Sequence, residues 1–316
     1  IYIRADGSID PPTVPILRVG NVYTFTDNIY DEIVVQRNSV TIDGAGYTLQ
    51  GDGRGFILSS INDVTIKNTN IKGSYYDSYR ITTAITLGGS NNTIHGNNIT
   101  DCLAGIIFKN YERVPAPYGY EYVVVCYNNI ITGNSITNND YGIGGGDGMG
   151  VYSYNNTFSR NTITNNKEIG VHLYHAENTT LWGNTIANNM VGISLDGIGR
   201  PSNNALYHNN FMNNTKHVSA IEAYIWDDGY PSGGNYWSDY NGRDLRSGPF
   251  QNLTGIDGIG DTPYEIDANN QDNYPLMHPY GSIRNLDTNL TYFTIQSAIN
   301  APETLNGHTI FVRSGV

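Results

Sequence analysis

The sequence has little charge and no long apolar run, and each of these shortages excludes a class of protein. Only 15% of its 316 residues are charged, which argues against a charged, disordered chain. No run of 18 apolar residues occurs, so we expect no membrane-spanning helix. The 17 basic residues are outnumbered by 29 acidic ones, and the net charge of −12 disfavours a nucleic-acid partner. Such a charge suits cations, neutral glycans or simple solubility.

Cysteine is almost absent, and neither Cys102 nor Cys126 belongs to a C-x-x-C pair. A zinc or redox site therefore has no support. Two interpretations of these cysteines stay open. Cys102 could fill a small buried slot, or the two could form a disulfide that pins the segment between them in an extracellular setting.

The sequence starts at Ile1 without Met or a signal segment, so we expect a processed or excised piece whose targeting signal lies outside it.

Asparagine, in contrast, recurs in a fixed pattern. Five stretches share it: NNTIHGNNIT (91–100), NNIITGNSIT (128–137), NNTFSRNTIT (155–164), NTTLWGNTIA (178–187) and NNALYHNNFM (203–212). Each holds an apolar pair five residues apart, and two degenerate copies, Ile42/Tyr47 and Ile66/Ile71, precede them. A period in the twenties indicates a solenoid. Short alternating runs of Ile, Thr, Val and Asn without a helical period favour strands.

The sequence therefore predicts an all-β fold, a right-handed single-stranded parallel β-helix of roughly eight coils of about 24 residues. Two inward apolar columns are expected: Ile99, Ile136, Ile163, Ile186, Phe211; and Ile106, Ile143, Val171, Ile193, Val218. Two asparagine columns are expected at the corners: Asn97, Asn134, Asn161, Asn184, Asn209; and Asn139, Asn166, Asn189, Asn214. Asn tolerates the left-handed conformation of a sharp corner, and stacked amides can hydrogen-bond from coil to coil. Cys102 falls where the second column would have its Asn.

Composition divides the chain into four segments. Residues 1–32 should form an N-terminal cap with the first strands, 33–225 the coils, and 226–280 a C-terminal cap rich in Asp, Gly and aromatics. Residues 281–316 have a short amphipathic helix signal (Ile295, Ala298, Ile299) followed by a strand. They look like the start of a following β-helix module or a linker or assembly strand. A lone strand Thr309–Arg313 could pair with a neighbouring molecule by β-augmentation.

Two insertions and the acidic cap supply candidate binding residues. The insertions, 72–80 and 109–125, carry tyrosines that could stack on flat ligands, and insertions in solenoids often form the binding face: Tyr75, Tyr76, Tyr79, Tyr111, Tyr118 and Tyr120. In the cap, Asp257, Asp261, Asp267 and Asp272 lie in a Gly-rich segment of the kind that supplies oxygen ligands to a structural Ca²⁺. The alternative is that these Asp residues form turns.

Catalytic patterns are weak, so the predicted function is non-catalytic. The Asp227–Asp228 pair lacks the companions of a polygalacturonase-like site. The central coils hold few acids in register for a lyase: Asp101, Asp140, Asp147, Glu168, Glu177 and Asp196. His172 and His175 could face outward near Asp196 and bind a metal or transfer protons. A solvent-facing polar strand is the alternative for them.

Seven N-x-[ST] sequons are candidate glycosylation sites if the protein is exported. They are Asn91, Asn98, Asn155, Asn178, Asn213, Asn252 and Asn289. Asn252 and Asn289 lie outside the repeat and are the foremost candidates, because asparagines held in a column cannot be modified.

Three segments of the cap carry a family resemblance: WDDGYPSGGNYWSDY (226–240), DGIGDTPYEID (257–267) and DNYPL (272–276). With the Asn-rich coils, they make residues 1–280 similar to archaeal surface proteins with the NosD-like, CASH-type right-handed β-helix. The resemblance implies carbohydrate binding or sugar hydrolysis, and NosD itself serves copper-enzyme maturation in a periplasm. The sequence shows no Met/His/Cys cluster that would support copper. The final 35 residues resemble the opening of pectin-esterase-type β-helices, although the catalytic motifs of those enzymes are absent.

From these observations we expect an extracellular structural or adhesive module of an archaeal cell-surface protein, such as a surface-layer, sheath or filament building block. We expect it to bind copies of itself or sister modules, with polysaccharide as a further candidate partner. The expected cofactor, if there is one, is structural Ca²⁺. A carbohydrate-binding or carbohydrate-processing module is the alternative, and a copper-maturation factor is the third.

Overall fold

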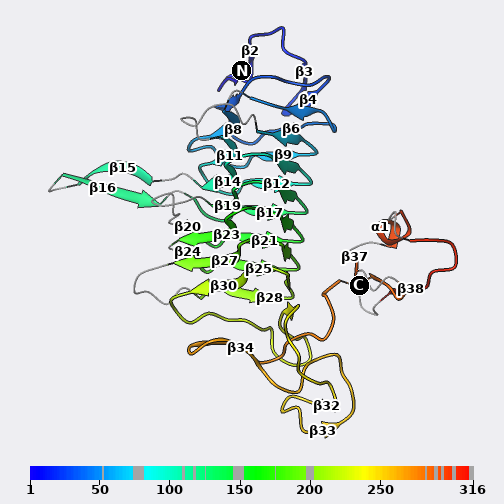
Figure 1. Ribbon diagram of the computed structural model, residues 1–316. Helices are drawn as coiled ribbons and strands as arrows, with labels where there is room; N and C mark the ends of the chain where they lie inside the picture. The colour runs from blue at the N-terminus through cyan, green and yellow to red at the C-terminus, as the bar shows by residue number, and fades with distance from the viewer. Residues whose placement is uncertain are drawn as a thin grey trace.

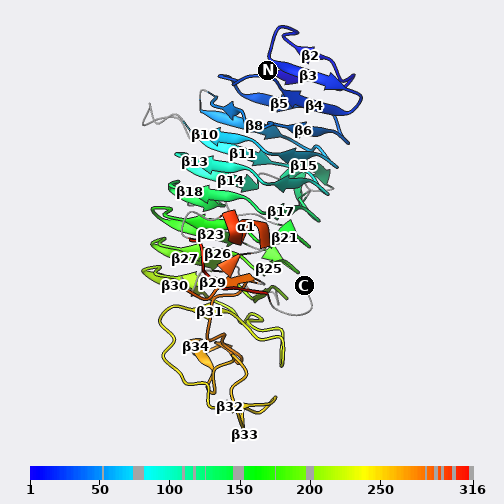
Figure 2. The ribbon, with the colours of Figure 1, turned by 90° about the vertical axis from the view of Figure 1, so that its right-hand side faces the viewer.

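The chain folds into a rod in which short strands wind around one axis (Figure 1). The computed structural model describes residues 1–51, 53–73, 82–108, 111–116, 119–124, 126–144, 153–174, 176–196, 203–281, 283–287, 291–292, 295–300 and 304–312. Seen after a quarter turn, the coils stack one above another along the rod (Figure 2). In the described residues no helix is long and apolar enough to cross a membrane.

Three sheets, here named A, B and C, form the walls of the rod. In spatial order sheet A contains β2 (Ile9–Asp10), β1 (Tyr2–Ile3), β5 (Ile33–Val35), β8 (Arg54–Leu58), β11 (Thr83–Leu87), β14 (Ala104–Phe108), β19 (Tyr141–Ile143), β23 (Ile169–Tyr174), β27 (Val191–Asp196) and β30 (Lys216–Ala220). Sheet B contains β28 (Ala205–Tyr207), β25 (Thr180–Trp182), β21 (Thr157–Ser159), β17 (Ile130–Thr132), β12 (Thr93–His95), β9 (Thr65–Lys67), β6 (Thr41–Asp43), β4 (Val22–Phe25) and β3 (Ile16–Val19). Sheet C contains β31 (Tyr236–Trp237), β29 (Asn210–Met212), β26 (Thr185–Ala187), β22 (Thr162–Thr164), β18 (Ser135–Thr137), β13 (Asn98–Thr100), β10 (Asn70–Lys72) and β7 (Thr48–Leu49).

The predicted parallel β-helix is confirmed. Each turn takes one strand from sheets B, C and A in that order, from β6–β7–β8 to β28–β29–β30, which makes seven complete turns. Before β6, β4, an isolated bridge from Ile29 to Leu49, and β5 pair in parallel with β6, β7 and β8 and add a less regular turn, in agreement with the prediction of roughly eight coils. There β1 pairs with β2, and β3 with β4, in antiparallel fashion. At the usual strand spacing, seven turns span about 35 Å.

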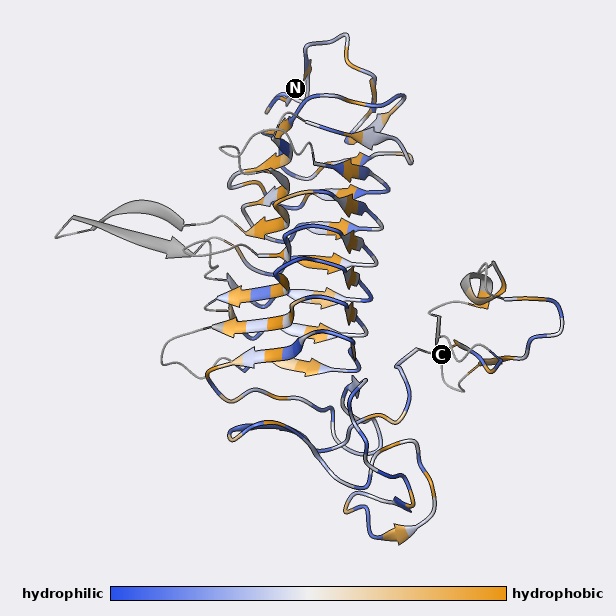
Figure 3. Ribbon diagram, in the orientation of Figure 1, coloured by the Kyte–Doolittle hydropathy of each residue, from blue (hydrophilic) through white to orange (hydrophobic). Residues whose placement is uncertain are grey.

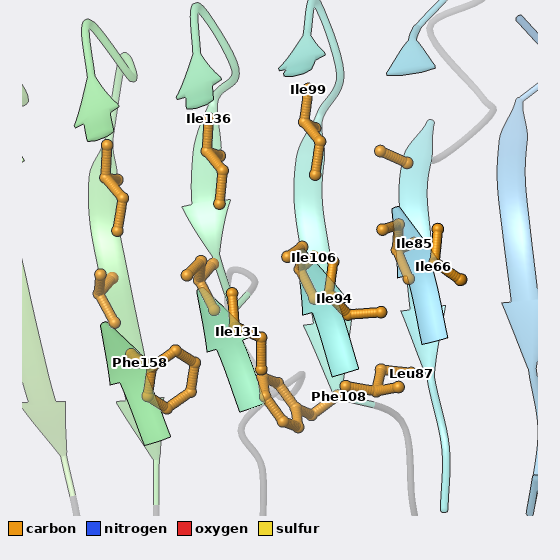
Figure 4. Close-up of a cluster of buried hydrophobic side chains, with 14 of the residues drawn as sticks. Ile66, Ile85, Leu87, Ile94, Ile99, Ile106, Phe108, Ile131, Ile136 and Phe158 are labelled. Carbon is orange, nitrogen blue, oxygen red and sulfur yellow. The ribbon is translucent and has the colours of Figure 1, made fainter. Parts of the chain in front are cut away.

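The core consists of apolar columns that run from coil to coil (Figure 4). Both predicted columns are present in register. Orange, apolar segments therefore recur in every turn of the rod (Figure 3). One expectation was wrong: in the first coil Leu49, not Tyr47, pairs with Ile71, and Tyr47 is 37% exposed. The Gly44–Gly46 turn makes that corner two residues longer than in the later coils, so the five-residue spacing fails there.

Buried asparagines link the coils in three ladders. In the first predicted ladder, at the corner between sheets B and C, each Asn donates its backbone N–H and Nδ2 to the Oδ1 of the Asn one coil further on. It comprises Asn97, Asn134, Asn161, Asn184 and Asn209, and it continues to Asn235. The second predicted ladder, between sheets C and A, is bonded in the same way. Such ladders tie every coil to the next through buried amides.

The corner conformation and the hydrogen bonding belong to different residues. The left-handed residue is the one just before each ladder Asn, for example Asn138, Asn165 and Asn188, with φ of 59°, 57° and 56°. The ladder Asn itself then points inward. The prediction that one Asn does both is therefore corrected: where an Asn-Asn pair occurs, its two members divide the tasks, and at the corner between sheets B and C a glycine, Arg160 or His208 takes the left-handed conformation instead.

The ends of the rod are closed by irregular chain and small antiparallel sheets. The C-terminal cap contains β32 (Arg246–Ser247) with β33 (Leu253–Thr254) and β34 (Tyr264–Asp267) with β35 (Asn270–Asp272). A hairpin of β15 (Tyr111–Ala116) and β16 (Gly119–Val124) projects from the side of the rod (Figure 1), and β20 (Ser153–Tyr154) pairs with β24 (Ala176–Glu177).

The last segment forms a small unit of its own. It contains β36 (Ile283–Asn285), β37 (Thr291–Tyr292), the predicted helix α1 (Ile295–Asn300) and β38 (Ile310–Val312). The expectation of a lone, unpaired strand at 309–313 is wrong, because β38 pairs antiparallel with β36 in the same chain. In α1, Ala298 is buried as the amphipathic pattern requires, whereas Ile295 and Ile299 are 50% and 53% exposed.

Candidate functional site

Only two of the six candidate tyrosines of the insertions fall on described residues. Tyr75, Tyr76, Tyr79 and Tyr118 lie outside the described residues. Tyr111 and Tyr120 lie on opposite strands of the β15–β16 hairpin, where they pair with Val124 and Pro115. The idea that these residues line a sugar-binding surface stays a prediction.

The four candidate calcium ligands each accept hydrogen bonds at separate places in the cap. Asp261 accepts from the backbone of Leu245 and Arg246. Asp257 accepts from the backbone of Ile259, and Asp267 from that of Asn269. Among the described residues, no three His, Cys, Asp or Glu side chains gather as a metal site would require. Asp257 and Asp267 accept from the backbone two residues further on, as the turn-forming alternative expects, whereas Asp261 holds a distant segment and Asp272 has a different role.

Asp272 ends the first asparagine ladder. Its fully buried carboxylate accepts from the Asn235 backbone at 2.7 Å, Trp237 Nε1 at 2.9 Å and the Tyr274 backbone at 3.1 Å. Burial raises the pKa of Asp272 to about 7, although these three N–H donors favour the charged form. Glycine at position 234 provides the space for this carboxylate, since a Cβ there would stand 1.9 Å from Asp272 Oδ1. This buried carboxyl group thus joins the cap to the last coil.

The second ladder ends on a histidine. Asn214 Nδ2 lies 3.2 Å from Nδ1 of His217, whose Nε2 lies 3.3 Å from Asp239 Oδ1. Tyr264 donates its hydroxyl to the same carboxylate at 3.0 Å and stacks on Trp237 at 4.4 Å. Burial lowers the pKa of His217 in spite of Asp239, and burial raises the pKa of Tyr264 well above its usual value. Both ring nitrogens of a neutral His217 thus have a partner, one on the coil (Asn214) and one in the cap (Asp239). The imidazole therefore joins the coil to the cap.

These two ladder ends should respond to pH in opposite ways. The folded pKa of His217 is lowered, so its stabilisation is present above about pH 6.5 and is lost as the pH falls through the folded value. The folded pKa of Asp272 is raised to about 7, so its stabilisation is present below about pH 4 and is lost as the pH rises through 7. On acidification from pH 6.5 to 4 the wild type gains stability from Asp272 and loses stability from His217. The stability of Asp272→Asn relative to wild type should therefore fall over this range, and that of His217→Gln should rise. Thermal midpoints followed by tryptophan fluorescence test this, and parallel profiles of all three proteins would refute it.

The two cysteines are separate buried thiols on different corners. Cys102 occupies the start of the second ladder, where its backbone N–H donates to Asn139 Oδ1. The Sγ of Cys102 donates to the Thr100 carbonyl at 3.3 Å, and that of Cys126 to the Leu87 carbonyl at 3.9 Å. The structure thus contains no bond between them, and the buried-slot interpretation describes Cys102.

Thiol titration checks this arrangement. Burial raises the pKa of Cys102 to about 12, and both cysteines are at most 1% exposed, so Ellman's reagent should not react with the folded protein. After denaturation without a reductant, two thiols per chain should appear. No thiols at that step would mean that a disulfide forms in solution.

Acids and histidines of the coils do not converge on a reacting atom in the described residues. Asp101 takes a left-handed corner position and lies 3.8 Å from Lys72, and Asp140 lies 2.6 Å from Lys167. His172 is opposite Ser194 on the next coil, while Asp196 is opposite Tyr174. His175 and Asp147 lie outside the described residues.

Six of the seven sequon asparagines fall on described residues, and all six are exposed: Asn91, Asn98, Asn155, Asn178, Asn213 and Asn252. Asn289 lies outside them. Four of the six, Asn91, Asn155, Asn178 and Asn213, hold left-handed corners just before a buried column residue. Glycosylation at these positions stays a prediction.

The corner between sheets B and C holds a cluster that the sequence patterns did not reveal. Before the ladder residue, successive coils place Asn68, Gly96, Gly133, Arg160, Gly183 and His208 in left-handed conformation, with φ between 52° and 66°. Glycine takes this conformation without strain, whereas other residues held there cost roughly 1–3 kcal/mol. Arg160 and His208 are therefore retained at a conformational cost in positions where the neighbouring coils use glycine.

Both of these residues contact aromatic rings. The Arg160 guanidinium lies 4.8 Å from the centroid of Trp182, which is in register with Tyr207 on the next coil. His208 stacks on Tyr280 with centroids 4.1 Å apart and meets the edge of Tyr207 at 5.2 Å. We name these five residues the aromatic corner.

Neighbouring polar groups hold the aromatic corner in place. Asn210 Nδ2 donates to the Tyr280 carbonyl at 3.0 Å, which fixes the chain beneath that ring. His208 Nε2 lies 2.9 Å from the Ser232 carbonyl, and Ser232 Oγ donates to Asp228 at 2.7 Å. Burial, followed by the charge of Asp228, raises the pKa of Tyr207. Trp182, Tyr207 and Tyr280 are all partly exposed, whereas His208 is buried beneath them.

Comparison with known families agrees with the fold. Residues 118–242 match the family described as periplasmic copper-binding protein (NosD), and residues 29–172 match a protein family of unknown function (DUF1565). Each match covers less than half of the chain, and together they support a NosD-like β-helix protein. A comparison with curated proteins found no match.

Proposed function

We propose that this chain is a rigid, non-catalytic β-helix module with a structural or adhesive role at a cell surface. The observation that carries the proposal is the continuity of the rod: the first ladder runs from Asn97 to Asp272 without a missing hydrogen bond. A coil tied at every turn resists bending, because any bend must separate buried amides from their partners. Rigidity along one axis is what a spacer or a building block requires.

A location outside the cytoplasm is part of the proposal. Support comes from the match to a family whose printed description is periplasmic and from the sequons. An archaeal origin and a place in a surface layer rest on the sequence resemblance. The partners are copies of the same module, with Ca²⁺ as a candidate for the contacts between acidic caps.

Two other functions remain candidates. Carbohydrate binding is favoured by partly exposed aromatic rings on the rod, and copper binding by the description of the matched family. For copper, the described residues contain no group of three His, Cys, Asp or Glu at metal-binding distance. Equilibrium dialysis at micromolar copper decides this candidate.

Assembly and catalysis can be separated in one experiment. Purified protein at neutral pH is sedimented with Ca²⁺ and with a chelator, while a parallel sample is incubated with polysaccharides and assayed for new reducing ends. The proposal expects sedimenting assemblies and no new reducing ends. Strictly monomeric protein in both conditions, or release of reducing ends, would contradict it.

A further inference from the structure

We propose that the hairpin at the C-terminal end of the rod inserts its apolar side chains into the surface of an anionic lipid bilayer. We name residues 245–256, which contain β32 and β33, the apolar tip. In both views this hairpin lies at the end of the rod opposite the N-terminus (Figure 1, Figure 2). The inference goes beyond the structural role proposed above and is tested separately from it.

The apolar tip exposes side chains of the kind that a fold usually buries. Phe250 and Ile256 are 82% and 78% exposed, the highest values among the large apolar side chains of the described residues. Leu245 and Leu253 are 56% and 60% exposed and belong to the same hairpin. These four side chains add nothing to the core of the rod. Exposed apolar groups gathered in one place mark a site of interaction with another molecule or with a membrane.

Polar groups behind the apolar tip hold its backbone in place. Asp261 accepts hydrogen bonds from the N–H groups of Leu245 and Arg246 at 3.1 Å and 2.9 Å. Tyr274 donates its hydroxyl to the Pro249 carbonyl at 3.0 Å. The hairpin is therefore fixed to the cap before it meets a partner, and binding does not have to order it first.

The charge of the apolar tip is positive, although the whole chain has a net charge of −12. Arg246 is the only charged residue of the tip, and it is exposed. Asp244, just before the tip, accepts from the N–H groups of Asp257 and Gly258, so its carboxylate is directed at the backbone. An exposed guanidinium beside apolar side chains matches the phosphate of a lipid headgroup, which it binds through two N–H groups. The tip thus complements an anionic surface in charge.

The size of the apolar tip favours a bilayer over a protein partner. Each partner of a stable protein complex buries about 800 Å², whereas even a large aromatic side chain buries only about 150–250 Å². Four partly exposed side chains on one hairpin fall short of that area. They suit a lipid surface, because each side chain enters the headgroup region separately and gains free energy in proportion to its own apolar area.

The sequon at Asn252 sets a condition on this binding. Asn252 lies on the apolar tip and is exposed. A glycan attached there would hold the hairpin away from a bilayer, so the proposal requires an unmodified Asn252. Protein made in bacteria without glycosylation is therefore the material for the test.

Flotation with lipid vesicles measures the binding. The vesicles contain phosphatidylcholine alone or equal parts of phosphatidylcholine and phosphatidylglycerol, and a chelator prevents Ca²⁺ from bridging the acidic cap to the headgroups. The wild type should float with the anionic vesicles and far less with the neutral ones. The double variant Phe250→Ser/Ile256→Ser should lower the partition coefficient by about tenfold or more. Arg246→Ala should lower it roughly fivefold, and on anionic vesicles only.

Val19→Ser is the matched control for the apolar substitutions. Val19 is 68% exposed on β3 in the N-terminal cap, at the other end of the rod, so this variant should float like the wild type. Because all the replaced side chains are exposed, the thermal midpoints of the variants should equal that of the wild type. A loss of binding then reports on the tip and not on unfolding.

Phe250→Trp separates membrane insertion from adsorption through another part of the surface. Its tryptophan emission should shift to the blue on addition of anionic vesicles, and lipids with brominated acyl chains should quench it. The proposal is overturned if the wild type does not float with anionic vesicles, if the double variant floats equally well, or if the emission of Phe250→Trp does not respond. A wild-type dimer that the double variant abolishes in sedimentation velocity without lipid would also overturn it, because the tip would then bind a second copy.

Discussion

Replacing Asn161 with alanine should destabilise the rod more than any surface substitution. Asn161 is 1% exposed and takes part in hydrogen bonds to both neighbouring coils. Its Oδ1 accepts from the Asn134 backbone and side chain, and its Nδ2 donates to the Ile131 carbonyl and to Asn184. Alanine leaves these buried partners without it, and each unsatisfied group costs about 1–3 kcal/mol. We expect a loss of roughly 3–5 kcal/mol in unfolding free energy, measured by urea denaturation followed by circular dichroism.

Asn165→Gly is the matched control for this substitution. Asn165 lies exposed on the same coil and holds a left-handed corner at φ 57°, which glycine adopts freely. Its replacement should change the unfolding free energy by less than about 0.5 kcal/mol. Equal effects of the two substitutions would show that the buried ladder adds nothing beyond the corner conformation.

The second large effect is expected at Asp272. Alanine at this position removes the common acceptor of the Asn235 and Tyr274 backbones and of Trp237 Nε1. Two buried donors and the part-buried Tyr274 N–H would lose their partner, which should destabilise the cap by roughly 3–5 kcal/mol. The loss should appear as exposure of Trp237 to solvent, seen as a red shift of its emission below the main unfolding transition.

Two further variants make the Asp272 result specific. Asp272→Asn keeps an oxygen for two of the three donors and should lose much less stability than the alanine variant. Glu265→Ala removes an exposed carboxylate from β34 and should leave the cap unchanged. If Asp272→Ala melts like the wild type, the ladder does not end on this carboxyl group in solution.

The apolar columns and two of the ladders were predictable because they follow a strict period. The position of Ile136 or Asn134 within its repeat decides that the side chain faces inward, so an alignment of the repeats was enough to place both residues. The period failed only where local chain length changes, as at Gly44–Gly46, where Leu49 replaced the predicted Tyr47.

The third ladder was visible in the sequence but was not identified. Asn92, Asn129 and Asn156 stand second in the Asn-Asn pairs that open three of the aligned stretches, and Asn204 stands in the same place in a fourth. They bond along the corner between sheets A and B, where Thr179 donates to Asn204. Because each corner was expected to need one asparagine with both roles, only two ladders were predicted.

The cap and the aromatic corner could not be derived from a repeat. Asp272 reaches Asn235 across 37 residues, and Asn210 fixes Tyr280 across 70. These contacts occur only once, at the end of the rod, so no repeat in the sequence relates the positions that form them. The acidity of the cap suggested metal ligands, whereas burial and N–H donors give Asp272 its structural role.

Electron microscopy of the purified protein at neutral pH, with Ca²⁺ and with a chelator, tests the central claim most directly. A rigid surface module should appear as straight rods of constant width that join into ordered filaments, tubes or sheets. Sensitivity to the chelator would place Ca²⁺ in the contacts. Dispersed single rods in both conditions would contradict the building-block role, and flexible or globular particles would contradict the ladder-stabilised rod itself.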